Sequence, residues 1–218
     1  MPRFITILIA TLLLASLLQT GTAGELARCV NPFVGTDGHG HTFPGATVPF
    51  GMVQLSPDTR VEGWDACAGY HYSDSLILGF SHTHLSGTGV ADYGDILLAP
   101  IIGTFRPHAS SFTHREEVAV PGYYQVILDG KINVELTATP RAGMHSYTFP
   151  RSDSANVMID LHHGLGPDRV IESHVDILND REIAGDRRSA GWAKDQHLYF
   201  WAECSKPFLA SGVTINDT

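Results

Sequence analysis

The sequence is short of cysteine and of basic residues, and both shortages exclude classes of protein. Its 218 residues include three cysteines, Cys29, Cys67 and Cys204, which lie far apart and form no C-x-x-C pair, so neither a zinc motif nor a redox motif is present. One disulfide with a free thiol and three unpaired cysteines both fit this spacing. Fourteen basic residues against 23 acidic ones give a net charge of −9, which offers no attraction to nucleic acid or to an anionic membrane.

The chain also lacks repeats, low-complexity linkers and long amphipathic helices. Its one extended hydrophobic run, residues 4–18, is too short to predict a membrane span. Because small residues follow at 20–24, the pattern predicts a secretory signal peptide over residues 1–24 that is cleaved after Ala23 or Gly24. We therefore expect an exported protein, periplasmic or extracellular, whose mature domain spans residues 25–218.

The domain has two parts that differ in amino-acid composition. Residues 29–100 are rich in Gly, Pro, His, Thr and Asp, with short apolar runs, which indicates loops on a scaffold of short strands. After residue 110 strands dominate, and Asp129-Gly130 predicts a hairpin turn between two alternating segments. The predicted strands are 123–130, 131–140, 144–150, 155–163 and 196–204. The fold class that follows is all-β, an antiparallel β-sandwich, and the sequence stops so soon after an apolar strand that we expect it to be incomplete at the C-terminus.

Paired histidines are the most conspicuous chemical feature. In the stretch GFSHTHLSGTG, residues 79–89, an extended backbone would project His82 and His84 to one side. Such a pair suits a metal ion or a hydroxyl-rich ligand, and the local pattern does not choose between them. No Cys or acid nearby completes a recognisable ligand set, so no metal site is expected in this chain.

A second candidate site lies upstream, where His39 and His41 occupy a glycine-rich loop and GWDACAGYHYSD, residues 63–74, offers Trp64 and Asp65. An aromatic face beside hydrogen-bonding groups is what a sugar requires, because its C–H face packs on a ring while its hydroxyls need directed partners. A Trp-Asp pair in a loop also serves ordinary packing and turn capping, so both interpretations stay open.

Four long segments carry a family resemblance. VNPFVGTDGHGHTFPGATVPFGMVQLSPDT, GWDACAGYHYSDSLILGFSHTHLSGTG, DYGDILLAP and VELTATPRAGMHSYTFP closely resemble the N-terminal domain of glycoside hydrolase family 92, the exo-acting, calcium-dependent α-mannosidases. The resemblance runs from about Cys29 to the last residue. It implies a β-super-sandwich that precedes an (α/α)6 barrel, with the active site at their junction and release of mannose with inversion.

The resemblance also implies which domain holds the catalytic residues and which residues of this chain contact substrate. It implies that both catalytic carboxylates and most of the calcium site lie in the barrel, so no catalytic residue is expected here and this fragment alone is expected to be inactive. Trp64 matches a position that contributes to the leaving-sugar subsite in α-1,2-active members, and Asp65 is a hydroxyl acceptor beside it. The other candidate substrate-binding residues, each of which could instead brace a loop, are His39, His41, His82 and His84.

The expected partners are a mannose-containing glycan and the C-terminal (α/α)6 catalytic domain. Two alternatives remain open: an autonomous carbohydrate-binding module, which binds sugar without a partner domain, and a His-based metalloenzyme complete within this chain. The sequence leaves the linkage preference, the natural glycan and the oligomeric state undetermined.

Overall fold

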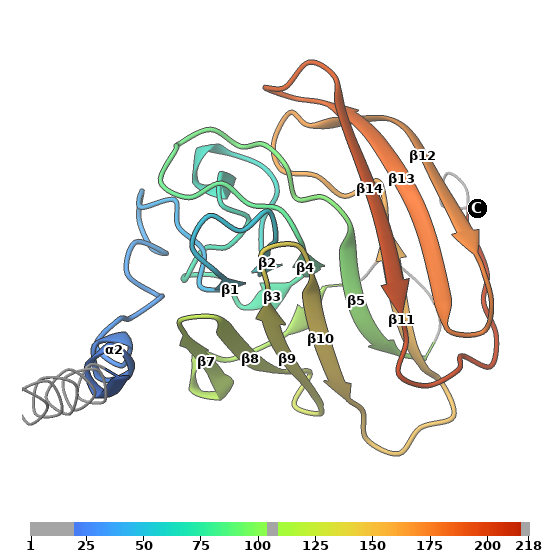
Figure 1. The fold of residues 1–218 in the computed structure, drawn as a ribbon, viewed down its shortest axis with the longest axis horizontal. Coiled ribbons are helices and arrows are strands. Elements are labelled where there is room, and N and C mark those ends of the chain that lie inside the picture. The colour runs from blue at the N-terminus through green and yellow to red at the C-terminus, as the bar shows by residue number, and fades with distance from the viewer. Residues whose placement is uncertain (1–19, 104–108, 215–218) are drawn as a thin grey trace, which may run out of the picture.

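A computed structural model of the chain describes residues 20–103 and 109–214. Most of the predicted signal peptide, residues 1–24, lies outside the described residues, and α2 (Thr20–Ala27) covers the predicted cleavage point. In Figure 1 this helix stands apart from the sheets. Within the described ranges, no helix combines the length and apolar character that crossing a membrane requires.

Antiparallel strands make up the rest of the regular structure, apart from two short 3-10 turns, η1 (Trp64–Ala66) and η2 (His114–Glu116). The strands are β1 (Ala46–Thr47), β2 (Gln54–Asp58), β3 (Leu76–Ile77), β4 (Gly79–Ser81), β5 (Leu97–Ile102), β6 (Ser110–Ser111), β7 (Glu117–Val120), β8 (Tyr123–Leu128), β9 (Ile132–Ala138), β10 (Gly143–Thr148), β11 (Ala155–Asp160), β12 (Arg169–Ile177), β13 (Glu182–Ala190) and β14 (Gln196–Glu203). They pair in the orders β1-β2-β4-β5-β11, β10-β9-β8-β7, β12-β13-β14 and β3-β6 (Figure 1).

The hairpin predicted at Asp129-Gly130 is confirmed. β8 and β9 pair antiparallel, and the chain reverses at Asp129 and Gly130, whose φ angles are 50° and 64°. The Lys131 N–H donates to the Leu128 carbonyl and closes the turn at 2.9 Å. Side chains of β8 alternate between half-buried and buried, as the period-two pattern predicts for a sheet with one face in the core.

The main core lies between the β1-β2-β4-β5-β11 sheet and the β7–β10 sheet, so the predicted β-sandwich is confirmed. Contacts of β9 with β1 and β2 join the two layers. Each large apolar side chain buried in this way contributes roughly 1.5–3 kcal/mol of transfer free energy. The buried residues of this core are Ala46, Val53, Leu55, Tyr70, Ile77, Phe80, Phe112, Tyr124, Val126, Leu128, Ile132, Val134 and Leu136.

The third sheet, β12–β14, differs from the sandwich. Two of its strands, β12 and β13, were absent from the sequence-based prediction. β13 carries Arg187 and Ser189, rather than apolar residues, at its two buried positions, and β12 has no buried position at all. The Arg187 guanidinium lies between two carboxylates, Asp95 at 3.1 Å and Asp168. A buried cation that is paired in this way does not interrupt a strand, although it hides the strand from hydrophobic-pattern analysis.

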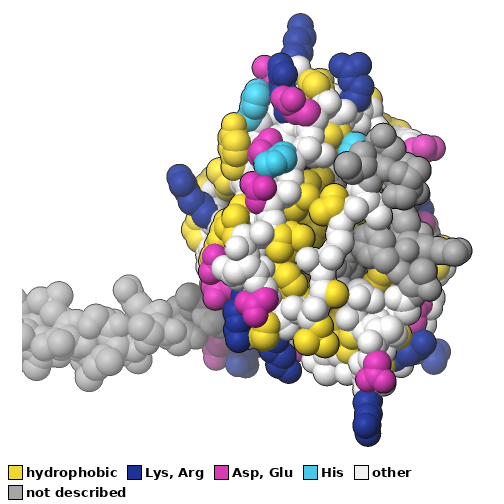
Figure 2. All heavy atoms as spheres, turned by 90° about the vertical axis from the view of Figure 1, so that its right-hand side faces the viewer, with side chains coloured by type: hydrophobic (Ala, Val, Ile, Leu, Met, Phe, Trp, Pro, Cys, Tyr) yellow, Lys and Arg dark blue, Asp and Glu magenta, His cyan; other side chains and the backbone are white. Residues whose placement is uncertain are grey.

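The same sheet leaves large apolar side chains exposed, including Tyr199 and Trp201 on β14 and Ile171 and Ile177 on β12. Figure 2 looks onto the side of the molecule where β12 lies in Figure 1, and hydrophobic side chains gather in a band there. Tyr199 and Trp201 share one face of the sheet, whereas Ile177 pairs with Ile183 and lies on the other face. Exposed apolar side chains that cluster commonly mark contact with further protein. The three cysteines are free thiols, so the disulfide alternative is not realised in this structure.

Candidate functional site

Tight packing of glycines shapes the loop that carries His39 and His41. A Cβ on Gly40 would lie 2.1 Å from the carbonyl oxygen of Gly35, so only glycine allows the two backbones to approach this closely. The loop is closed further by a hydrogen bond from the His71 Nε2–H to the carbonyl of Gly38, at 3.1 Å. These contacts hold the two histidines at fixed places on a segment that has no regular secondary structure.

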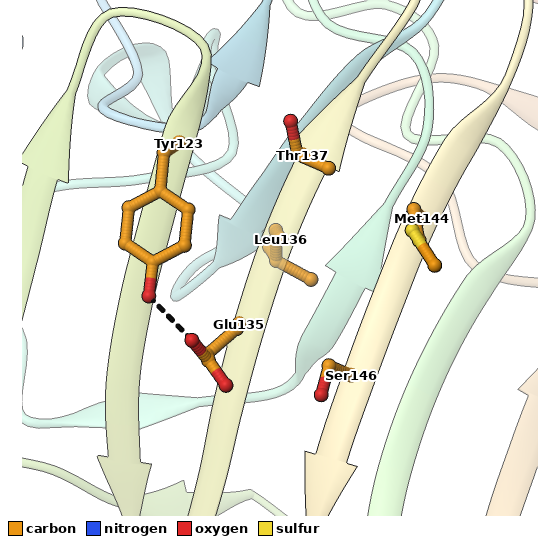
Figure 3. Close-up of a pocket in the computed structure, with 6 residues that line it drawn as sticks. All are labelled: Tyr123, Glu135, Leu136, Thr137, Met144 and Ser146. Atoms are coloured by element: carbon orange, nitrogen blue, oxygen red, sulfur yellow. Dashed lines mark hydrogen bonds between the residues drawn. The ribbon is translucent and has the colours of Figure 1, made fainter.

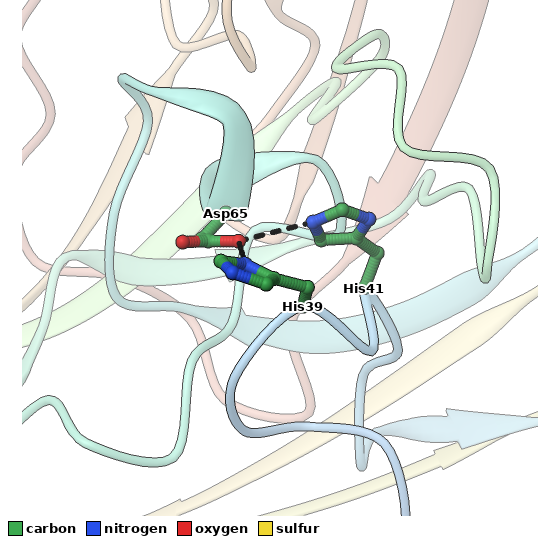
Figure 4. Close-up of side chains that lie close together, drawn as sticks. All are labelled: His39, His41 and Asp65. Atoms are coloured by element: carbon green, nitrogen blue, oxygen red, sulfur yellow. Dashed lines mark hydrogen bonds and ion pairs between the residues drawn. The ribbon is translucent and has the colours of Figure 1, made fainter.

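The 3-10 turn η1 presents the opposing side chains. It begins after Gly63, whose φ of 88° favours glycine, and it projects Trp64 and Asp65 toward the histidine loop. Asp65 Oδ1 accepts hydrogen bonds from His39 Nδ1 at 2.7 Å and from His41 Nε2 at 3.1 Å (Figure 4). The hydrogen bond from His39, reinforced by that from His41, lowers the pKa of Asp65 below its ordinary value.

Trp64 is held by one hydrogen bond and two ring contacts, yet most of the residue stays exposed. Its indole N–H donates to the Gly89 carbonyl at 3.0 Å, and its ring centroid lies 4.9 Å from that of His39 and 4.5 Å from that of His41. The residue nevertheless stays 60% exposed. The result is a flat apolar surface, immediately beside a carboxylate, on a loop that cannot move freely. This is the geometry that packing against a sugar ring requires.

His84 lies elsewhere, in a fully buried network beneath the loops. Its Nδ1 lies 2.7 Å from the Gln54 carbonyl oxygen and its Nε2 lies 2.8 Å from Asp58 Oδ1. Because both ring nitrogens lie within hydrogen-bond distance of protein oxygens, the ring is fixed at both ends. The second oxygen of Asp58 accepts from His163 Nε2, also at 2.8 Å. Burial raises the pKa of Asp58, but the charge of His84 and the hydrogen bonds from His163 and His84 hold that pKa well below its ordinary value.

His82 belongs to another chain of hydrogen bonds, in which the donor and the acceptor of each bond are fixed by the bond before it. Its Nδ1–H donates to the Ile96 carbonyl at 2.7 Å, which leaves Nε2 to accept from His145 Nε2 at 3.0 Å. The Tyr147 hydroxyl then donates to His145 Nδ1 at 2.7 Å. Both imidazoles are neutral in this chain. Burial, together with mutual repulsion between the two rings, lowers the pKa of His145.

The predicted site residues therefore separate into two groups. Four of them, His39, His41, Trp64 and Asp65, meet at one place. His82 and His84 do not join them, because β4 ends at Ser81 and the alternation expected of a strand does not continue past it. All four ring nitrogens of His82 and His84 already have protein partners, which favours bracing over ligand contact.

The bracing partners His145 and His163 had no predicted role, although both occur in segments predicted as strands. A strand that ends in the dipeptide His162-His163 was the available signal. Nothing in the sequence indicated that Asp58 would be shared between two histidines from distant segments.

One group of metal-ligating side chains stands out among the described residues. One donor atom from each of His39, His41 and Asp65 lies within 4.8 Å of the others. Asp65 is an acid that the sequence analysis did not place beside these histidines as a third ligand. The donor set does not fit the calcium that the family resemblance implies, because calcium takes 6–8 oxygen ligands and two of these three donors are nitrogens.

A shallow surface pocket of about 210 Å³ lies on the β8–β10 sheet, away from this cluster (Figure 3). In it the Tyr123 hydroxyl donates to Glu135 Oε1 at 2.7 Å. It contains no histidine and no cluster of carboxylates. Its lining therefore offers no group of side chains for metal binding or for acid–base catalysis.

Comparisons with known proteins give a consistent result. Residues 29–218 match the family model of the glycosyl hydrolase family 92 N-terminal domain. A protein of Arthroderma benhamiae described as an uncharacterized secreted glycosidase is 32% identical over 155 residues, and the match covers 63% of this chain and 20% of that protein.

Solved structures are also similar. A family 92 α-mannosidase from Bacteroides thetaiotaomicron, in complex with mannoimidazole, is 42% identical with a TM-score of 0.81, and the match covers 84% of this chain and 26% of that one. A family 92 inverting mannosidase from the same organism is 30% identical with a TM-score of 0.70, over 84% of this chain and 25% of that one. This chain thus spans about a quarter of the length of these relatives.

Proposed function

This chain belongs to the glycosyl hydrolase family 92 N-terminal domain family, and we propose that it is the sugar-contacting domain of a secreted, inverting exo-α-mannosidase that acts on α-1,2-linked mannose. Among its solved relatives are a family 92 α-mannosidase and a family 92 inverting mannosidase. Because this chain matches only about a quarter of their length, the activity is proposed for a longer protein. In it, an (α/α)6 domain supplies the catalytic groups and most of the calcium ligands.

The observation that carries the proposal is the exposure of Trp64, at 60%, beside the Asp65 carboxylate. A mannose ring stacks its C–H face on the indole, and one of its hydroxyls donates to the Asp65 carboxylate. His39 and His41 hold that carboxylate in place at 2.7 Å and 3.1 Å. We assign these four residues to the leaving-sugar side of the cleft, and we assign His82 and His84 to the scaffold beneath it.

The chemistry of the site explains why a second domain is needed. Inversion requires a carboxylic acid that protonates the leaving oxygen and a carboxylate about 6.5–9.5 Å away that activates water. Asp65 cannot be that acid, because its lowered pKa keeps it ionised at neutral pH. Asp58 cannot be the base, because it is fully buried and both its oxygens are engaged by histidines. The family resemblance assigns the acid and the base to the partner domain, for which the exposed apolar side chains of β12–β14 are a candidate contact surface.

Replacement of Trp64 by Ala in the longer enzyme tests the assignment. Loss of one stacking contact should lower kcat/KM for α-1,2-mannobiose by an amount equivalent to about 1–3 kcal/mol, with a smaller loss for an aryl mannoside, whose leaving group is not a sugar. The matched control is Trp192→Ala, since Trp192 is similarly exposed, at 66% against 60%, and is not part of this cluster. Equal losses for the two substrates would remove Trp64 from the leaving-sugar subsite.

The 218-residue chain alone, assayed with calcium, should hydrolyse neither substrate, because it lacks a positioned general acid. Calcium-dependent turnover by this chain would contradict the proposal that a second domain supplies the catalytic groups. Tight sugar binding by the chain without turnover, in contrast, would favour the alternative of an autonomous carbohydrate-binding module.

A further inference from the structure

We propose that His39, His41 and Asp65 form a zinc-binding site. The two imidazoles come from one glycine-braced loop, and the carboxylate comes from η1, 24 and 26 residues further along the chain. Their convergence is therefore a product of the fold rather than of local sequence. The inference goes beyond the proposed function, since it requires no sugar and no second domain.

The spacing of the donor atoms matches what zinc requires. Zinc ligands of this type lie at about 2.0–2.2 Å from the metal, so the corners of a tetrahedral site are about 3.3–3.5 Å apart. Asp65 Oδ1 lies 2.7 Å from His39 Nδ1 and 3.1 Å from His41 Nε2. These two distances need to widen by a few tenths of an ångström to reach ligand spacing, and the donor atoms of the two histidines lie within 4.8 Å of each other. Each coordinating nitrogen gives up its proton to the other nitrogen of its ring, through solvent, so the imidazoles stay neutral.

The types of donor atom indicate which metal ion would bind, and their exposure indicates whether a coordination position stays open. Two imidazoles and one carboxylate suit zinc, whereas calcium and magnesium prefer oxygen. The His41 side chain is 5% exposed, that of Asp65 is 30% exposed and that of His39 is 69% exposed. The site is thus anchored on one side and open on the other. Three protein ligands with an open fourth position are the arrangement that binds water or an exchangeable ligand. That open side lies beside Trp64.

Metal titration of the 218-residue chain, prepared without a histidine tag and freed of metal by a chelator, tests the proposal. Calorimetry with zinc chloride should find one ion per chain with a Kd in the micromolar range or below. Cobalt chloride should give the visible absorption bands of a four- or five-coordinate Co²⁺ ion. Calcium chloride should neither bind at this site nor displace zinc.

Variants distinguish this cluster from other surface histidines. His39→Ala and Asp65→Asn should each weaken zinc binding about a hundredfold, because loss of even an outer-shell partner typically costs 10–100-fold. Both side chains are partly exposed, so circular dichroism should show an unchanged fold. The matched control is His174→Ala, since His174 also lies near two carboxylates, each at 3.7 Å, and should leave zinc affinity unchanged.

Two outcomes would overturn the proposal. One is the absence of stoichiometric zinc binding below millimolar concentration. The other is stoichiometric binding that survives both His39→Ala and Asp65→Asn, which would place the ion elsewhere on the chain.

Discussion

Replacement of Asp58 by Asn removes a buried charge from the centre of the scaffold. The Asp58 side chain has no exposure to solvent, and its two oxygens accept hydrogen bonds at 2.8 Å from His84 and at 2.8 Å from His163. His163 lies 105 residues further along the chain, after β11. The carboxylate therefore ties the end of β2 to the segment that leaves the edge strand of the same sheet.

The size of the effect follows from these contacts. Asparagine has the same shape but keeps only one acceptor oxygen, so its amide group must face one of the two N–H donors. Hydrogen bonds to charged groups contribute about 1.5–3 kcal/mol each, and removal of one partner from a buried ion pair costs about 3–5 kcal/mol. We expect Asp58→Asn to lower the free energy of unfolding by about 3–5 kcal/mol. Since folded proteins are stable by about 5–15 kcal/mol, the variant should still fold.

The pH dependence supplies a second signature. Because the folded-state pKa of Asp58 lies below its unfolded value of about 3.9, the carboxylate contributes stability above about pH 4 that is lost as the pH falls toward the folded pKa. The wild-type chain should therefore lose stability below pH 4 more steeply than Asp58→Asn does.

Urea unfolding followed by tryptophan fluorescence, at pH 7 and at steps down to pH 3, measures both effects. The matched control is Asp153→Asn, because Asp153 is exposed and its replacement should change stability by less than about 0.5 kcal/mol. Two results would refute the ion-pair argument. One is a loss of less than about 1 kcal/mol in the free energy of unfolding of Asp58→Asn, and the other is a loss of stability below pH 4 as steep as that of the wild type.

Two further predictions concern His145 and export. Because the pKa of His145 is lowered in the folded chain, the unfolded chain binds more protons below about pH 6.5. The thermal stability of the wild-type chain should therefore fall as the pH drops from 7.5 to 5.5, and that of His145→Gln should fall less. An equal fall in the two proteins would show that this imidazole does not titrate as argued. The signal-peptide pattern predicts a mature N-terminus at Gly24 or Glu25, which mass spectrometry of protein exported by a bacterial host would establish, and a retained Met1 would contradict it.

The hairpin of β8 and β9 shows why some strands were predictable from the sequence. β8 and β9 alternate apolar and polar residues on either side of an Asp-Gly turn, so local preference and burial agree. β13 could not be found in this way, because Arg187 is buried there only through carboxylates supplied by other segments. A buried ion pair depends on tertiary contacts between distant segments, and hydrophobic periodicity contains no signal for such contacts.

The candidate site shows the same limit. The expectation that His82 and His84 share a face assumed a strand, but β4 ends at Ser81, so the period-two rule no longer applies. The Gly-His-Gly-His and Trp-Asp patterns each predicted substrate-binding residues, and the structure brings the two patterns together. Their union around Asp65 was not predictable, because it depends on the close approach of Gly40 to Gly35 and on the turn at Gly63.

Exposure of the ring and freedom of its nitrogens separate the histidines that brace from those that can meet a ligand. His84 uses both nitrogens and is buried, and His82 likewise uses both. His39 uses one nitrogen on Asp65 and leaves most of its side chain in solvent. Because the buried rings fix the loops through hydrogen bonds, the exposed ring and Trp64 can remain accessible without losing their positions. A binding site on loops needs both kinds of histidine, and only the three-dimensional contacts tell them apart.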